Sequence, residues 1–123
     1  MRYNSPETSW RRVAAQDTEL AGYKTPAGTQ IFLSLGSANH DEALFDNPET
    51  FDIHRENARA NIAFGRGIHF CLGNRLAIIK ATIAIETLTQ RIPSLDLVAN
   101  QRSDFFPNFT FRGPKELWLT WQV

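Results

Sequence analysis

The chain has 123 residues, 42% of them hydrophobic, so it can bury one modest core and forms a single domain or part of one. Thirteen Lys and Arg balance thirteen Asp and Glu, which excludes a global electrostatic attraction to nucleic acid or anionic lipid. A single cysteine excludes an internal disulfide and fits a reducing, cytoplasmic location. We also expect no signal peptide and no membrane segment, because no apolar run reaches spanning length.

The first third of the chain is expected to form small β-hairpins. Short extended pieces run from Trp10 to Thr29, and Gly22 and the Pro-Ala-Gly turn at residues 26–28 separate them. The stretch TQIFLSLG, residues 29–36, follows. It is β-branched and apolar enough to predict a buried strand.

A polar connector occupies the next part of the sequence, up to the cysteine loop. Pro48 prevents a long helix, so we predict one short helix near residues 41–45 and an ordered loop after it. Phe45 and Phe51 are the apolar anchors of the connector. Plain packing is the interpretation we favour for both rings.

One long helix is predicted at residues 74–92, before Pro93. Its apolar residues recur at steps of three and four in two adjoining stripes, which are Ile78, Ala81, Ile85, Leu88 and Ile92, and Leu72, Leu76, Ile79 and Ile83. Two stripes predict a mostly buried helix, yet the chain has no second long helix to cover it.

Two short strands are predicted after the helix. The first is LDLV at residues 95–98, and the second is a closing strand at residues 116–123. Alternation in the closing strand places Leu117, Leu119 and Trp121 on one face.

The most informative stretch is FGRGIHFCLGNRLA, residues 64–77, which contains the only cysteine, Cys71. Glycines lie at positions 65, 67 and 73, and the long helix begins directly after the loop. The start of a helix carries partial positive charge and unpaired N–H groups, both of which favour a thiolate over a thiol. A metal is the natural partner of such a sulfur.

The sequence leaves three other roles for Cys71. A nucleophile with His69 as its base lacks an identifiable third group to orient the base. A structural zinc site lacks paired ligand spacing, because the histidines at positions 40, 54 and 69 are scattered. A structural buried thiol does not need the glycines and the flanking aromatics, whereas a loop that lies flat against a planar group does. A haem with an axial cysteinate is a combination in which such a loop makes sense.

Phe64, Gly67, Cys71 and Gly73 stand at the spacing FxxGxxxCxG, which resembles the haem-binding signature of the cytochrome P450 family, soluble bacterial type. The resemblance extends over nearly the whole of this chain, but the chain matches only the C-terminal part of the proteins in the family. It implies an α+β fold: small β-hairpins, the cysteine-ligand loop, one long buried helix and a closing strand. Residues 1–123 would then be an incomplete domain without the N-terminal part and the distal helix.

The resemblance also implies roles for single residues. Cys71 would be the axial ligand of the haem iron, with Phe64 packed beside the sulfur and Gly67 and Gly73 shaping the loop. Arg12 and His69 fall where the family places donors to the two haem propionates, which would be charge-assisted hydrogen bonds. A solvated strand residue is the alternative for Arg12.

Two surfaces follow from the same resemblance. One would line the pocket of a small apolar organic substrate, with ordinary packing as the alternative; it consists of Thr8, Ser9, Trp10, Thr110 and Phe111. The other is a basic cluster of Arg66, Arg75 and Lys80, where the family docks an electron donor of the ferredoxin or flavodoxin type. A merely solvated surface is the alternative for this cluster.

The sequence departs from the family pattern at several places. Arg2 aligns with the arginine of the family's ExxR motif, whose glutamate would lie before Met1. Thr50 stands where an arginine or histidine usually completes that cluster, and Ile78 and Lys80 stand where bacterial relatives commonly carry arginine and glutamate. The distal helix that relays protons to oxygen is not in the chain, so no catalytic residue is assigned.

The resemblance implies a haem-thiolate monooxygenase that inserts one oxygen atom into an apolar substrate, with this chain inactive by itself. Two alternatives remain at the level of sequence. One is a non-catalytic haem-binding remnant, and the other is a thiol-dependent hydrolase that uses Cys71.

Overall fold

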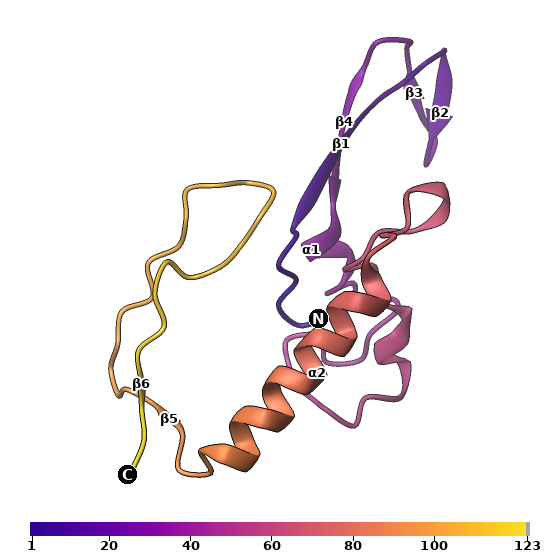
Figure 1. Cartoon of the computed structure of the whole chain (residues 1–123). Coiled ribbons are helices and arrows are strands. Elements are labelled where there is room, and N and C mark those ends of the chain that lie inside the picture. Colours follow the sequence, from indigo (N-terminus) through magenta and orange to yellow (C-terminus); the bar gives the residue numbers. More distant parts are fainter. Residues whose placement is uncertain (123) are drawn as a thin grey trace. The chain divides into compact units, whose positions relative to one another are not determined.

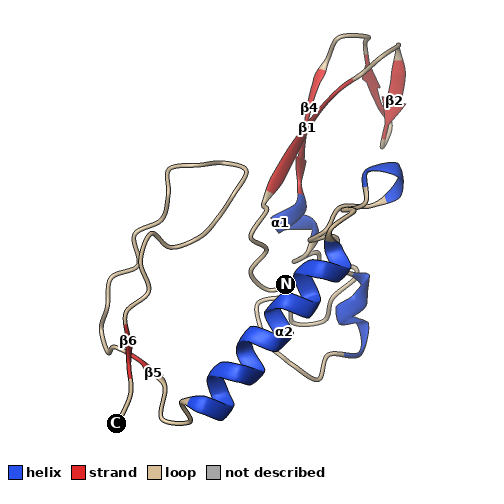
Figure 2. Ribbon diagram, viewed as in Figure 1, coloured by secondary structure: helices blue, strands red, loops and turns tan. Residues whose placement is uncertain are grey.

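The computed structural model describes residues 1–122 (Figures 1 and 2). The strands are β1 Ser9–Val13, β2 Thr18–Leu20, β3 Tyr23–Thr25, β4 Gln30–Ser34, β5 Asp96–Leu97 and β6 Leu119–Thr120. The helices are α1 Leu35–Ala38, α2 Asn74–Arg91 and the two 3-10 helices η1 Glu56–Ala60 and η2 Gly67–His69. The chain divides into two compact units. Unit 1 contains Met1–Ala63 and Asn108–Arg112, and unit 2 contains Phe64–Pro107 and the residues from Gly113 onward.

Two antiparallel ribbons form the β part of unit 1, as the sequence predicts. In one, β1 pairs with β4, so that Ser9 lies opposite Ser34 and Val13 opposite Gln30; in the other, β2 pairs with β3. The turn at residues 26–28 has the predicted form, because Gly28 takes a φ of +83° and its N–H donates to the Ala14 carbonyl at 2.8 Å.

The burial predicted for β4 is wrong. The strand forms, but it is exposed along most of its length, and the Phe32 side chain is 58% accessible. The reason is that β4 pairs only with β1, so the ribbon has two strands and no second layer of unit 1 over it.

The helix predicted at residues 41–45 is also wrong. The Asp41 carboxylate accepts the Ala43 N–H at 2.9 Å, and the Asp41 carbonyl accepts the Phe45 N–H at 2.8 Å, which makes a single turn. Aspartate competes in this way with helical backbone bonding. Helical segments form instead at α1, where the Ser34 hydroxyl accepts the Ser37 N–H, and at η1.

The core of the described residues lies in unit 1. Phe45 and Asn39 are fully buried, and Ala14, Leu35 and Ala63 are the other core residues. Plain packing is therefore confirmed for Phe45. The Phe51 ring instead contacts Tyr3 edge-on, with ring centroids 5.5 Å apart, and stays 70% exposed.

In unit 2, helix α2 occupies the predicted range and ends one residue earlier. None of its residues is buried, and Ile85 is 63% exposed. The burial that two apolar stripes predict is thus not reached within this chain, as the lack of a covering helix implies. No helix among residues 1–122 is both long and apolar enough to cross a membrane.

The two predicted C-terminal strands form a small ribbon in unit 2. Asp96 lies opposite Thr120 and Leu97 opposite Leu119, so the closing strand is shorter than residues 116–123. The Gln101 side chain replaces further ladder bonds, since its amide accepts the Trp118 N–H and donates to the Trp118 carbonyl, both at 2.9 Å.

We expect the 123-residue polypeptide by itself to aggregate or to unfold without a cooperative transition. Each large apolar side chain left in water forfeits about 1.5–3 kcal/mol of burial free energy, and α2 leaves a whole stripe of them exposed. Thermal circular dichroism and the dispersion of an NMR correlation spectrum test this directly. A cooperative transition together with well-dispersed amide resonances would contradict the expectation.

Candidate functional site

Backbone hydrogen bonds close the cysteine loop. The Cys71 N–H donates to the Phe64 carbonyl at 2.9 Å, and the Phe70 N–H donates to the Gly67 carbonyl at 3.0 Å within η2. On the other side, the Cys71 carbonyl accepts from the Asn74 side-chain amide at 2.7 Å and from its N–H at 3.2 Å. Cys71 is therefore fixed from both directions, three positions before α2 begins.

Two glycines make the loop sterically feasible. Gly65 and Gly67 have φ values of +72° and +69°, a region in which residues with a Cβ are strained. A Cβ on Gly65 would also approach the His69 carbonyl oxygen to 3.4 Å. Gly73 differs: its φ is −84°, and an added Cβ would lie at ordinary contact distance, 3.9 Å, from the Cys71 sulfur.

The Cys71 thiol is free and half-buried. The side chains beside it in sequence are apolar and turned to solvent, with Phe70 about half exposed and Leu72 fully exposed. Residues 1–122 contain no cluster of three or more His, Cys, Asp or Glu that could hold a metal ion, so a zinc site of that kind is not found in this part of the chain. A single free cysteine with apolar neighbours at positions 70 and 72 fits a haem, whose iron takes one axial cysteine from the protein.

The residues predicted to line a substrate pocket are brought together in unit 1 from opposite ends of the sequence. The Thr8 N–H donates to the Thr110 carbonyl at 2.7 Å, and the Thr8 and Ser9 hydroxyls both donate to the Phe109 carbonyl at 2.7 Å. The hydroxyls are thus used in joining two segments. The Trp10 and Phe111 side chains are exposed.

Glu7 belongs to the same cluster and was missed by the sequence analysis. It forms an antiparallel bridge with Phe111. Burial raises the pKa of Glu7 above its usual value, and the nearby Trp10 side chain opposes this shift. The sequence did contain a signal for Glu7: it is a carboxylate within an otherwise uncharged stretch, directly before the predicted pocket residues Thr8, Ser9 and Trp10.

The basic side chains lie in both units. Arg66, Arg75 and Lys80 belong to unit 2 and are exposed, Arg66 before η2 and the other two on α2. Arg12 belongs to β1 in unit 1 and is half-buried, and its Nη1 donates to the Arg11 carbonyl at 2.8 Å. His69 closes η2 and is exposed.

Arg2 is the buried cation of unit 1. Its Nη1 donates to the Asn39 carbonyl, and its Nη2 to the Pro48 carbonyl, both at 2.7 Å, with the Thr50 carbonyl at 3.3 Å from Nη2. The guanidinium carbon lies 5.0 Å from the centre of the Phe45 ring. No acidic side chain of residues 1–122 forms an ion pair with Arg2. Thr50 takes part through its backbone, not its side chain.

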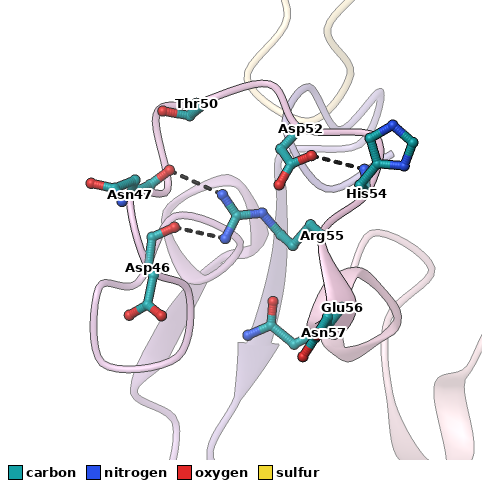
Figure 3. A pocket seen from close by; sticks show the side chains of 8 residues that line it. All are labelled: Asp46, Asn47, Thr50, Asp52, His54, Arg55, Glu56 and Asn57. Atoms are coloured by element: carbon teal, nitrogen blue, oxygen red, sulfur yellow. Dashed lines mark hydrogen bonds between the residues drawn. The ribbon is translucent and has the colours of Figure 1, made fainter.

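A second arginine, Arg55, organises the loop after Pro48 and was also missed. Figure 3 shows its guanidinium directed at the carbonyls of Asp46 and Asn47, at 2.7 and 3.0 Å. The Asp52 carboxylate accepts the His54 N–H at 2.8 Å. The polar hollow beside these residues is about 470 Å³. The sequence gives no signal for this role, because an arginine in a polar connector is ordinarily a solvated surface residue.

Comparison with known proteins gives consistent matches. The family model described as Cytochrome P450 matches residues 1–111. The biotin biosynthesis cytochrome P450 of Bacillus subtilis (strain 168) is 43% identical over 122 residues, which cover 99% of this chain and 30% of the relative. The solved structure of cytochrome P450 CREJ has a TM-score of 0.94 at 47% identity and covers 99% of this chain and 30% of that chain.

A further solved structure is P450BioI in complex with hexadec-9Z-enoic acid ligated acyl carrier protein. It has a TM-score of 0.92 at 43% identity and covers 98% of this chain and 31% of that chain. The chain belongs to the cytochrome P450 family, and it spans about 30% of the length of the Bacillus subtilis relative. The predicted α+β class is confirmed.

Gly65→Ala and Gly73→Ala form a matched pair of loop variants. We expect Gly65→Ala to lower the free energy of unfolding by about 1–2 kcal/mol, because alanine is strained at positive φ. Gly73→Ala should change it by less than about 0.5 kcal/mol. The measurement is urea unfolding of a chimaera in which this chain replaces the matching segment of the Bacillus subtilis relative. Equal effects of the two substitutions would contradict the assignment of the loop geometry.

Proposed function

We propose that this chain is the C-terminal part of a cytochrome P450 domain and that it binds haem through Cys71. The observation that carries the proposal is the cysteine loop: a free, half-buried thiol whose backbone is tied to Phe64 and to Asn74. The family membership and the spacing FxxGxxxCxG support the same assignment.

Each residue of the site has a distinct task in this proposal. Cys71 supplies the thiolate, Phe64 shields it, and Gly67 and Gly73 let the loop lie close to a planar ring. Arg12 and His69 orient the cofactor through its propionates, since a cation is the strongest partner of a carboxylate in a partly dry pocket.

Haem held by a thiolate supplies the chemistry of a monooxygenase, the insertion of one oxygen atom into a substrate. The residues of this chain bind and orient the haem and the substrate. Segments 6–10 and 108–112 form one wall of the pocket for a small apolar organic substrate, with Trp10 and Phe111 as its exposed rings. No residue of this chain is assigned to proton delivery. We place the reaction in the cytoplasm, where a lone cysteine stays reduced.

The electron donor is proposed to be an acidic ferredoxin or flavodoxin. Arg66, Arg75 and Lys80 are exposed in the same unit as Cys71, and a basic surface of this kind favours encounter with an acidic partner.

A non-catalytic haem-binding role is the second candidate. It is favoured by Arg2, which has backbone partners but no carboxylate among residues 1–122. Haem uptake without substrate turnover in the chimaera distinguishes this role from monooxygenation.

The absorption spectrum of the reduced, carbon monoxide-bound chimaera tests the proposal. We expect the Soret band of thiolate-ligated haem, shifted far to the red, and we expect Cys71→Ser to abolish the shift. His69→Ala is the matched variant in the same loop: it should reduce haem retention several-fold and keep the shifted band. A red-shifted band that persists in Cys71→Ser would overturn the proposal.

A further inference from the structure

The Cys71 carbonyl accepts two hydrogen bonds from one residue. The Asn74 side-chain amide donates to it at 2.7 Å, and the Asn74 backbone N–H donates to it at 3.2 Å. The bonding of α2 lies beyond this point, where the Ala77 N–H donates to the Gly73 carbonyl at 2.9 Å. The carbonyl with two donors therefore belongs to the cysteine loop, and the side chain that reaches it comes from the first residue of the helix.

An ordinary helix cap does not account for the Asn74 side chain. An asparagine that caps a helix accepts a backbone N–H of the first turn with its side-chain oxygen. Asn74 acts in the opposite sense, because its amide nitrogen donates to a carbonyl three residues earlier. Asn74 is also half-buried between the exposed residues Gly73 and Arg75, so the bond is partly shielded from competing water.

We infer that Asn74 is a positioning residue that tunes how strongly the Cys71 thiolate donates charge to haem iron. The inference rests on the proposed function. A carbonyl oxygen is the negative end of a dipole, here within the same residue as the sulfur, and two N–H donors place partial positive charge against it. The electrostatic potential at the sulfur becomes less negative, so the thiolate donates less charge and the reduction potential of the haem rises.

Asn74→Ala removes the amide donor and keeps a good helix former in the first turn of α2. At the midpoint potential of the unsubstituted chimaera, we expect the ratio of reduced to oxidised haem to fall about threefold. Spectroelectrochemical titration measures this ratio. The iron–sulfur stretching band should also move to higher frequency, because a thiolate that donates more charge binds iron more strongly.

Asn61→Ala is the matched control. The Asn61 amide makes the same kind of bond, to the Ala58 carbonyl three residues earlier at 2.6 Å, but neither residue belongs to the cysteine loop. Asn61 also accepts the Ala63 N–H at 3.1 Å, so its substitution should lower the free energy of unfolding at least as much as Asn74→Ala. Only Asn74→Ala should move the potential and the iron–sulfur band. An unchanged potential in Asn74→Ala, or an equal shift in Asn61→Ala, would overturn the inference.

Asn74→Asp gives a second reading if Asn74→Ala does not fold. Its ionised carboxylate has the shape of the amide and cannot donate, and an acidic side chain stabilises the first turn of a helix. The ratio of reduced to oxidised haem should fall by more than about threefold, because a negative charge replaces the donor; an unchanged ratio overturns the inference.

The carbon monoxide spectrum separates the two levels of the argument. A missing red-shifted Soret band in the unsubstituted chimaera would overturn the proposed function and this inference together. A normal red-shifted band with an unchanged potential in Asn74→Ala counts against the role of Asn74 alone.

Discussion

The hydrogen bond from the Cys71 N–H to the Phe64 carbonyl is the constraint on which the site depends. It closes an eight-residue loop in which Gly65 and Gly67 adopt conformations that other residues avoid, and it sets the position of the sulfur before α2 begins. Because the loop is closed by backbone groups, its shape depends on glycine at two positions more than on the side chains between them. The side chains are then free to face a cofactor.

Unit 1 is stabilised in a different way. Arg2 ties together the carbonyls of Asn39, Pro48 and Thr50, and its guanidinium lies near the Phe45 ring at the centre of the core. A buried arginine that has only neutral acceptors is costly, and a carboxylate would lower that cost. The exposed stripes of α2 likewise contribute little burial to the stability of residues 1–122.

Sequence patterns predicted the elements whose signals are local. The recurrence of apolar residues at steps of three and four predicted α2 to within one residue. The Pro-Ala-Gly turn predicted the first ribbons, and the glycines around Cys71 predicted a loop directly before the helix. Burial of β4 could not be predicted, because an apolar strand looks the same whether or not a second layer covers it. The turn at Asp41 was missed because its carboxylate competes with the backbone for a single N–H.

The two charged residues that the sequence did not single out show the same limit. Arg55 organises a loop through carbonyls eight and nine residues away, and Glu7 acquires its setting from Phe111, more than a hundred residues later. Neither contact can be predicted from the periodicity or the spacing of residues in the sequence. Both become apparent only when distant segments are placed beside each other.

The most direct test of the central claim is the iron–sulfur stretching vibration of the ferric chimaera, measured by resonance Raman spectroscopy with ³⁴S-labelled cysteine. If Cys71 is the axial ligand, the band moves to lower frequency on labelling and is missing in Cys71→Ser. A haem-loaded chimaera whose Raman spectrum is unchanged by the label, or unchanged by the substitution, would contradict the account.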